Sequence, residues 1–219
     1  MAGVADRLPE VRDRISAAGG DLKAITLVAV TKDFGSDAVD EAIDNGLADV
    51  GENRADQLAD KATALAGRDV RWHYLGRVQR NQVRKIADFV SLWQAVDRVA
   101  AAQEIARRAP GAAVLVQVNI SGEPQKHGAA EREIPALVDD LGRLGLDVRG
   151  LMAIGPTGPP ETARPGFKSL VALADRLALP VRSMGMTDDL EVAVQEGTTM
   201  LRIGRGLFGP RPEGPDLRR

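Results

Sequence analysis

The sequence predicts a single-domain α/β chain folded as a (β/α)8 TIM barrel with an extra N-terminal helix. Short β-branched or apolar runs alternate with longer segments of helical spacing along almost all of the 219 residues. The cycles repeat evenly, about every 20–35 residues, which implies parallel strands with right-handed crossovers. No segment reads as a second domain, so an open doubly wound sheet is the less favoured alternative. Residues 1–219 are therefore treated as one domain, with strands over about 26–204.

A helix is predicted ahead of the first strand, and the strand–helix cycles follow it. Within 2–18, Val4, Leu8, Val11 and Ile15 form one apolar helix face. The eight strands are predicted at 26–32, 48–52, 72–77, 89–96, 112–120, 148–154, 181–186 and 199–204. The helices between them are predicted at 36–45, 54–65, 81–87, 98–108, 131–144, 161–177 and 188–196, most of them stopped by glycine or proline. The segment 210–219 is rich in proline, glycine and charge and predicts a frayed tail.

The composition excludes several classes of protein. The absence of cysteine excludes disulfide-stapled folds, thiolate metal sites and thiol nucleophiles. A net charge of −2 and 3% aromatic residues argue against a nucleic-acid partner and predict an aliphatic core. No apolar run reaches the roughly 18–20 residues of a membrane span, and charges stand where a signal peptide would be apolar. We therefore expect a cytoplasmic protein with no membrane partner.

Lys32 ends the run L-V-A-V-T-K, which begins with four apolar residues, at the end of the first predicted strand. In a (β/α)8 barrel, the reactive face is the one where strands end and loops begin. Desolvation above an apolar core favours a neutral amine, which is the nucleophile that a Schiff base requires. A solvated lysine that caps the strand is the alternative, and spacing alone does not decide between the two.

Two glycine-containing segments late in the chain predict an anion site. S-M-G-M-T-D-D covers 183–189 and M-L-R-I-G-R-G-L-F-G covers 200–209, and each links a predicted strand to a helix. Glycine lets the backbone approach a ligand closely, and exposed N–H groups at a helix start attract phosphate. Barrel phosphate sites often use the loops after strands seven and eight. The alternative is that these glycines only serve tight turns.

Arg202 lies inside the eighth predicted strand, where alternation with Leu201 and Ile203 points it into the barrel lumen. A guanidinium is costly to bury unless its donors find acceptors. We therefore expect an acceptor beside it, either a ligand nitrogen or a lumen carboxylate such as Glu52 or Asp97.

Asn53 and the two histidines are the remaining polar candidates. Asn53 follows the second predicted strand, where it is placed either to donate to a bound ring or to N-cap the next helix. His73 and His127 lie on distant units without acids at ligand spacing. We predict a hydrogen-bonded strand histidine at position 73 and no metal site.

Together these motifs resemble the pyridoxal phosphate homeostasis proteins of the YggS/PROSC type, whose single-domain barrel is like the N-terminal domain of alanine racemase. The matching elements span 26–209 and are A-V-T-K, G-E-N, W-H-Y-L-G-R-V-Q-R-N, V-N-I, K-H-G, G-L-M-A-I, S-M-G-M-T-D-D and R-I-G-R-G-L-F-G. The resemblance implies that Lys32 carries pyridoxal 5′-phosphate (PLP) as an internal aldimine. It also implies that Arg202 faces the pyridine nitrogen and that Asn53 lies beside the cofactor.

The phosphate site carried over from this resemblance contains the main departures from the family pattern. The resemblance implies that Ser183 and Thr187, with the backbone amides of Gly204 and Arg205, hold the phosphate. The family usually has serine at the position of Thr187, which keeps a hydroxyl. It often has a small hydroxyl residue at the position of Arg205, where the added cation offers a different phosphate contact. Gln82 stands where lysine is common.

The resemblance implies a protein that binds, buffers or delivers PLP in vitamin B6 homeostasis, with apo PLP-dependent enzymes as recipients. We expect a monomer, because no second domain shields the barrel mouth. Lys126, in the K-H-G segment, is either a secondary acceptor during transfer or a solvated loop lysine.

Catalysis is not expected from this site, and no catalytic residue is assigned. PLP draws electrons into a protonated ring, and an arginine opposite the ring nitrogen suppresses that protonation. Racemases of this kind take a second base from a tyrosine of an additional domain, whereas the one tyrosine here, Tyr74, belongs to the third predicted strand. The alternatives are a PLP-dependent amino-acid racemase or lyase, and a barrel enzyme that acts on a sugar phosphate through Lys32.

Overall fold

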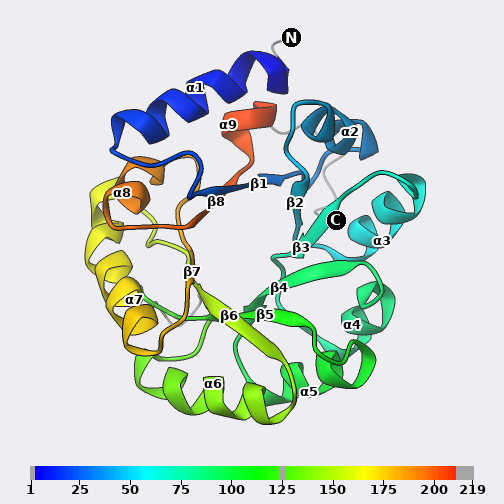
Figure 1. Cartoon of the computed structure of the whole chain (residues 1–219), viewed down its shortest axis with the longest axis vertical. Helices are drawn as coiled ribbons and strands as arrows, with labels where there is room; N and C mark the ends of the chain where they lie inside the picture. The colour runs from blue at the N-terminus through cyan, green and yellow to red at the C-terminus, as the bar shows by residue number, and fades with distance from the viewer. Residues whose placement is uncertain (1–2, 124–126, 211–219) are drawn as a thin grey trace, which may run out of the picture.

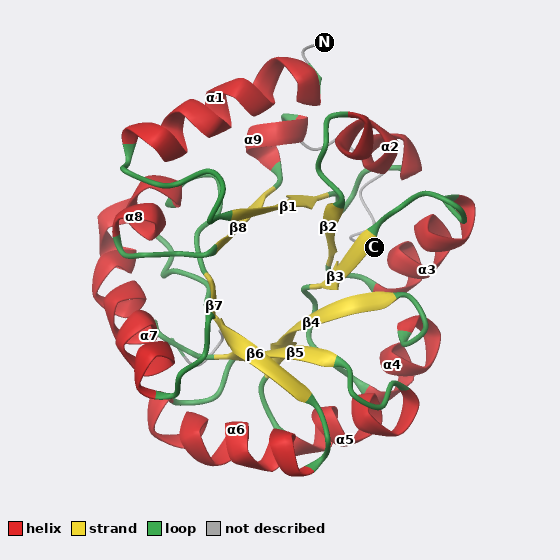
Figure 2. Ribbon diagram, viewed as in Figure 1, coloured by secondary structure: helices red, strands yellow, loops and turns green. Residues whose placement is uncertain are grey.

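The computed structural model describes residues 3–123 and 127–210, and within these ranges eight strands form one closed parallel barrel (Figure 1 and Figure 2). The strands are β1 Thr26–Val30, β2 Asp49–Glu52, β3 Arg71–Tyr74, β4 Val90–Val96, β5 Ala113–Gln117, β6 Asp147–Met152, β7 Val181–Ser183 and β8 Met200–Ile203. Each pairs with the next along the chain, and β1 closes the barrel against β8. The predicted (β/α)8 barrel is confirmed. Most strands end earlier than predicted, because the last residues of the run form the loops of the barrel mouth.

Helices surround the barrel in the order that the crossovers require (Figure 2). They are α1 Val4–Ala17, α2 Ser36–Asp44, α3 Ala55–Ala64, α4 Arg80–Ile86, α5 Val99–Arg108, α6 Ile134–Arg143, α7 Arg164–Arg176, α8 Leu190–Gln195 and α9 Arg205–Phe208, with 3-10 turns η1 Glu131–Glu133 and η2 Pro160–Ala163. The short α9 was not predicted, since four residues carry no helical period. In the described ranges, none of these helices is long and apolar enough to span a membrane. The predicted tail lies outside the described residues from position 211 onward.

Helix α1 fills the part of the outer ring that the short α9 leaves open, between α8 and α2 (Figure 1). The four residues of its predicted apolar face are all buried. The backbone N–H of Val4 donates to Glu41 of α2 at 2.6 Å. At the other end of α1, Arg14 donates to both carboxylate oxygens of Glu191 in α8, at 2.6 and 2.9 Å, and to the carbonyl of Thr187 at 2.9 Å. The predicted extra helix therefore closes the ring and holds the loop that leads into α8.

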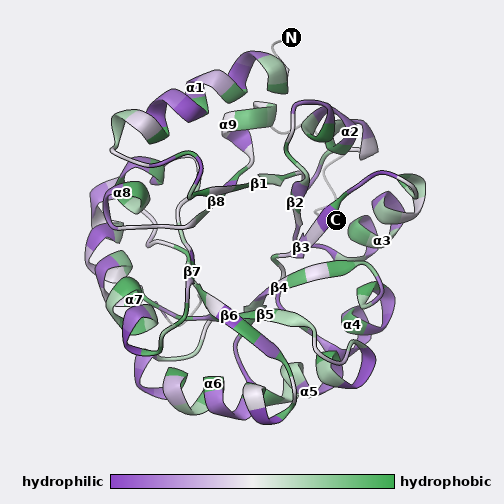
Figure 3. Ribbon diagram, viewed as in Figure 1, coloured by the Kyte–Doolittle hydropathy of each residue, from purple (hydrophilic) through white to green (hydrophobic). Residues whose placement is uncertain are grey.

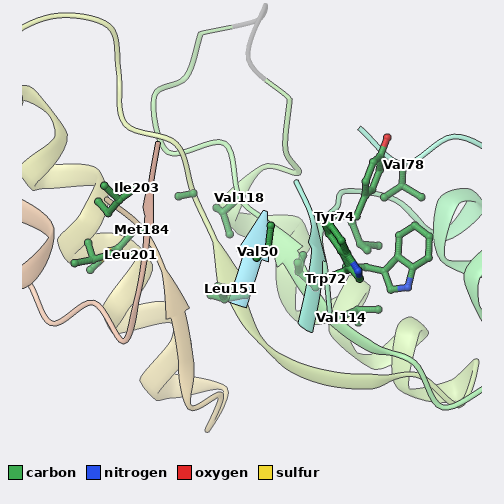
Figure 4. Packing of buried hydrophobic residues seen from close by; sticks show 14 of the residues in the cluster. Val50, Trp72, Tyr74, Val78, Val114, Val118, Leu151, Met184, Leu201 and Ile203 are labelled. Carbon is green, nitrogen blue, oxygen red and sulfur yellow. The ribbon is translucent and has the colours of Figure 1, made fainter. Parts of the chain in front are cut away.

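The core is mainly aliphatic, as predicted, and its members come from both the strands and the surrounding helices. Figure 4 shows part of this packing. The outer helices mix hydrophilic and hydrophobic residues, as expected where one face packs on a barrel and the other meets water (Figure 3). Tyr74 and Trp93 form an edge-on pair with ring centroids 5.6 Å apart. A smaller apolar cluster fills part of the lumen, with Val28, Leu115 and Met200 among its members.

A buried ion pair joins the carboxyl ends of β1 and β2. Lys61 of α3 reaches under the loop after β1 and donates to a carboxylate oxygen of Glu52 and, at 2.8 Å, to the carbonyl of Thr31. The Thr31 hydroxyl also donates to Glu52 at 2.8 Å. Lys61 is 6% exposed and Glu52 fully buried. Because Thr31 precedes Lys32, and Glu52 precedes Asn53, this cluster fixes the backbone from which two predicted site residues project.

Removing one partner of this pair should destabilise the fold. Lys61→Ala leaves the Glu52 carboxylate and the Thr31 carbonyl buried without a cation, so we expect a loss of about 3–5 kcal/mol in the free energy of unfolding, measured in urea. The double variant Lys61→Met, Glu52→Leu removes both charges and should recover most of that loss. Equal stability of Lys61→Ala and the wild type would contradict this account of the cluster.

Candidate functional site

A cavity of about 290 Å³ opens at the carboxyl ends of the strands. Its walls come from the ends of β1, β2, β3, β6 and β8 and from the loops that follow β6, β7 and β8. The lining residues are Val30, Lys32, Asn53, Leu75, Met152, Ile154, Met186, Thr187, Asp188, Arg202, Gly204 and Arg205. Six of the seven predicted site residues are therefore brought together at one cavity, and Ser183 is not among its lining.

Lys32 lies two residues beyond the end of β1, and its side chain is half-buried. The backbone before it is held by a hydrogen bond from the Thr31 N–H to the carbonyl of Gly51, at 3.1 Å. The cavity wall around Lys32 is largely apolar, with Val30 and Leu75 among its neighbours. A primary amine in such a wall is suited to condense with a carbonyl ligand.

Asn53 is exposed and projects from the end of β2 into the lining of the cavity. The alternative that it N-caps the next helix is wrong, because Arg54 occupies the N-cap of α3 and no side chain caps that helix. The loop after β3 approaches Asn53 closely: a Cβ added to Gly76 would lie 2.1 Å from the Asn53 carbonyl oxygen. Gly76 of the W-H-Y-L-G-R motif therefore permits this packing.

The loops after β7 and β8 meet at the other side of the cavity. The Thr187 hydroxyl accepts a hydrogen bond from the Gly206 N–H at 3.1 Å, which joins the two loops. The N–H groups at the start of α9, including that of Arg205, have no intrahelical partner. A Cβ on Gly204 would stand 3.3 Å from the Val30 carbonyl oxygen, so the absence of a side chain keeps this approach open. The arrangement presents a hydroxyl and backbone donors to one region of the cavity.

Arg205 is paired across the rim of this region. Its guanidinium donates to both carboxylate oxygens of Asp188 at 2.5 Å. The two side chains are 62% and 75% exposed, so water screens the pair and its contribution to stability is small. An anion that binds the guanidinium more tightly than Asp188 does can therefore displace Asp188 from Arg205.

Arg202 points into the lumen, as predicted, and is 5% exposed. It donates to the Ser183 hydroxyl at 2.6 Å and to the carbonyl of Ala153 at 2.8 Å. Burial lowers its pKa to about 10, against the attraction of the nearby Asp189 carboxylate, so it remains a cation at neutral pH. Two of the five guanidinium N–H donors are engaged in these bonds, and the remaining three have no acceptor in the described parts of the chain.

The two carboxylates suggested for Arg202 have other partners, so that alternative is wrong. Glu52 is held by Lys61, and Asp97 accepts from the neighbouring Arg98 at 2.6 Å. In both cases the carboxylate is paired with a cation from the segment that follows its strand, Lys61 for Glu52 and Arg98 for Asp97.

Ser183 lies beneath Arg202 rather than on the cavity wall. It ends β7, is fully buried, and donates its hydroxyl to Gln94 at 2.7 Å while it accepts from Arg202. Its implied contact with phosphate therefore stays a prediction, and its position in the structure is that of a partner to Arg202.

Several polar contacts inside the barrel were not predicted. His73 is the hydrogen-bonded strand histidine that we expected, but its partners, Asp49 at 3.0 Å and Gln94 at 2.7 Å, were not identified. The signal for Gln94 is present in the sequence, as a polar residue inside the apolar fourth strand. Among the described residues, no group of three or more His, Cys, Asp or Glu side chains is arranged to hold a metal. Lys126 lies outside the described residues.

Comparison with known proteins identifies relatives over nearly the whole chain. The family model described as alanine racemase, N-terminal domain, matches residues 11–212. A pyridoxal phosphate homeostasis protein of Pseudomonas aeruginosa is 39% identical and covers 98% of each chain. Among solved structures, PipY of Synechococcus elongatus with PLP bound superimposes with a TM-score of 0.82 at 29% identity, over 94% of this chain and 100% of PipY.

A more distant similarity shows the fold alone. An alanine racemase of Clostridium difficile 630 superimposes with a TM-score of 0.73 at 14% identity, over 94% of this chain and 57% of that chain. The full-length similarity to the homeostasis protein and the family match are much closer. The chain therefore belongs to the alanine racemase N-terminal domain family and, within it, to the pyridoxal phosphate homeostasis proteins.

Proposed function

We propose that this chain binds PLP in the cavity at the barrel mouth, with Lys32 as the point of covalent attachment, and acts in vitamin B6 homeostasis. The observation that carries the proposal is the cavity itself, which Lys32, Arg202 and residues of the loops after β7 and β8 line together. The names of its relatives, and the PLP bound to PipY, support the same ligand.

The described residues fit the chemical groups of PLP. The cofactor supplies an aldehyde that reacts with amines and an aromatic ring that takes up electrons. Lys32 matches the aldehyde, and Arg202 matches the ring nitrogen, because its free N–H groups require an acceptor. The Thr187 hydroxyl and the backbone amides of Gly204 and Arg205 match the phosphate. Asn53 lines the same cavity, where it would contact the cofactor.

Arg202 supports storage or delivery of the cofactor rather than catalysis. A guanidinium that stays charged at neutral pH disfavours a proton on the ring nitrogen beside it, so the ring is a weak acceptor of electrons. We propose that the bound cofactor is passed to apo forms of PLP-dependent enzymes. We also propose that the protein works in the cytoplasm as a monomer, folded as one domain.

The racemase alternative requires a second base, and Tyr74 is poorly suited to that role. It is fully buried and donates its hydroxyl to Gln82 at 3.0 Å. Burial raises the pKa of Tyr74 to about 12, which disfavours the phenolate that would accept a proton. Steady turnover of alanine or serine by the purified protein would decide for the alternative.

Replacing Lys32 should abolish covalent attachment. We expect the wild type, incubated with PLP, to develop the visible absorption band of a lysine-bound cofactor, which borohydride discharges, and peptide mapping after reduction to find the label on Lys32. Lys32→Ala should lose both signals, whereas Lys23→Ala, at an exposed lysine, should keep them. A Lys32→Ala protein with the full band would contradict the proposal.

Breaking the rim pair should change affinity for the phosphate. Asp188→Asn frees Arg205 for the cofactor and removes a like charge, so we expect up to about fivefold tighter PLP binding, the range set by an exposed ion pair. Arg205→Ala should weaken binding by a similar factor. Binding of pyridoxal, which lacks the phosphate, serves as the control in titrations followed by absorbance. If both variants shift pyridoxal and PLP equally, the rim pair does not act on the phosphate.

A further inference from the structure

A continuous row of hydrogen-bonded polar side chains, four of them buried and the fifth, Asp49, partly exposed, runs from β2 to β8. Arg202 contacts Ser183 at 2.6 Å, Ser183 contacts Gln94 at 2.7 Å, Gln94 contacts His73 at 2.7 Å, and His73 contacts Asp49 at 3.0 Å. We call these five residues the lumen row. Only Arg202 among them lines the cofactor cavity.

The three middle members of the lumen row are sealed from water. Ser183 and Gln94 are fully buried, and His73 is 3% exposed. Burying a polar group costs free energy unless it is hydrogen-bonded, and an apolar side chain would fill the same space without that cost. The neighbouring lumen cluster, which includes Leu115, is built in that apolar way. Packing alone therefore does not explain why these buried residues are polar.

The hydrogen bonds of the lumen row all run in one direction. A guanidinium only donates, so the Ser183 oxygen accepts from Arg202, and the Ser183 hydroxyl donates to the Gln94 carbonyl oxygen. The Gln94 amide is oriented with its nitrogen toward His73 Nδ1 and the Met200 sulfur, and because an amide N–H only donates, Nδ1 accepts and carries no proton. His73 is therefore the neutral tautomer with its proton on Nε2, directed at Asp49.

The far end of the row is fixed by an anchored carboxylate. Arg71 donates to both oxygens of Asp49 at 2.9 and 2.6 Å. Burial acts to raise the pKa of Asp49, but the hydrogen bonds from His73 and Arg71 outweigh it and lower the pKa to about 2. A cation thus stands at one end of the row and an anion at the other, with every bond between them donated in the same direction.

We infer that the lumen row positions Arg202 for the ring nitrogen of the cofactor, and that Gln94, His73 and Ser183 are positioning residues that act through Arg202. The inference rests on the proposed function. The Ser183 and Ala153 oxygens hold one edge of the guanidinium, which leaves its other donors for the cavity. Gln94 fixes the Ser183 hydroxyl hydrogen away from Arg202, so that the oxygen lone pair faces the cation.

The test compares two ligands that differ only at the ring nitrogen. Dissociation constants are measured for PLP and for its analogue with carbon in place of that nitrogen. Gln94→Leu keeps the side-chain volume but removes the acceptor for Ser183 and the donor to His73. We expect it to weaken PLP binding about three- to tenfold, the effect of one hydrogen bond, and to leave analogue binding unchanged. Leu115→Val, a lumen change outside the row, should affect neither ligand selectively.

Equal weakening of both ligands by Gln94→Leu, or unchanged PLP binding, would overturn the inference, because the row would then serve packing alone. In an Arg202→Ala background, Gln94→Leu should have no further effect on PLP binding, and additive losses would also overturn it. If Gln94→Leu does not fold, Ser183→Ala is measured in the same way. If Ser183 instead contacts the phosphate, Ser183→Ala would weaken binding of both ligands equally, since both carry phosphate.

The wild-type protein separates this inference from the proposed function. If it fails to bind PLP or to become labelled at Lys32 after reduction, the proposed function itself is wrong. If it binds and is labelled while Gln94→Leu shows no selectivity for the ring nitrogen, only the positioning role is wrong.

Discussion

A buried guanidinium needs acceptors on every side that water does not reach, and that requirement organises the lumen of this barrel. Arg202 obtains two acceptors from Ser183 and Ala153 and turns its remaining donors to the cavity. The polar residues beneath it are linked to it by a chain of hydrogen bonds, and a cluster of apolar side chains lies beside them. The positive charge of Arg202 also affects the chemistry of the proposed cofactor site, because it disfavours protonation of a ring nitrogen beside it.

Most of the fold and the outline of the site were predictable because they follow from local periodicity and barrel topology. Alternating apolar runs mark the strands, and the spacing of Val4, Leu8, Val11 and Ile15 marks the buried face of α1. In a closed parallel barrel the carboxyl ends of all strands lie at the same mouth, so residues that follow different strands converge there. Lys32 and the loops after β7 and β8 were placed on that basis.

What escaped prediction depends on register and on contacts between side chains distant in sequence. The partner of Glu52 is a lysine on the next helix, which no strand pattern indicates. Asn53 does not cap α3, because the helix starts one residue later than expected. Ser183 lies under Arg202 because β7 ends there and its side chain turns into the lumen. The hydrogen bond between Gln94 of β4 and Ser183 of β7 joins residues far apart in the sequence, so it required the folded barrel to be found.

A crystal structure of the protein soaked with PLP tests the central claim most directly. The account predicts continuous density between the Lys32 side-chain nitrogen and the cofactor, with the ring nitrogen within about 3 Å of an Arg202 nitrogen. The guanidinium should keep its bonds to Ser183 and Ala153. A cofactor whose ring nitrogen faces a carboxylate or solvent, with Arg202 turned away, would contradict it.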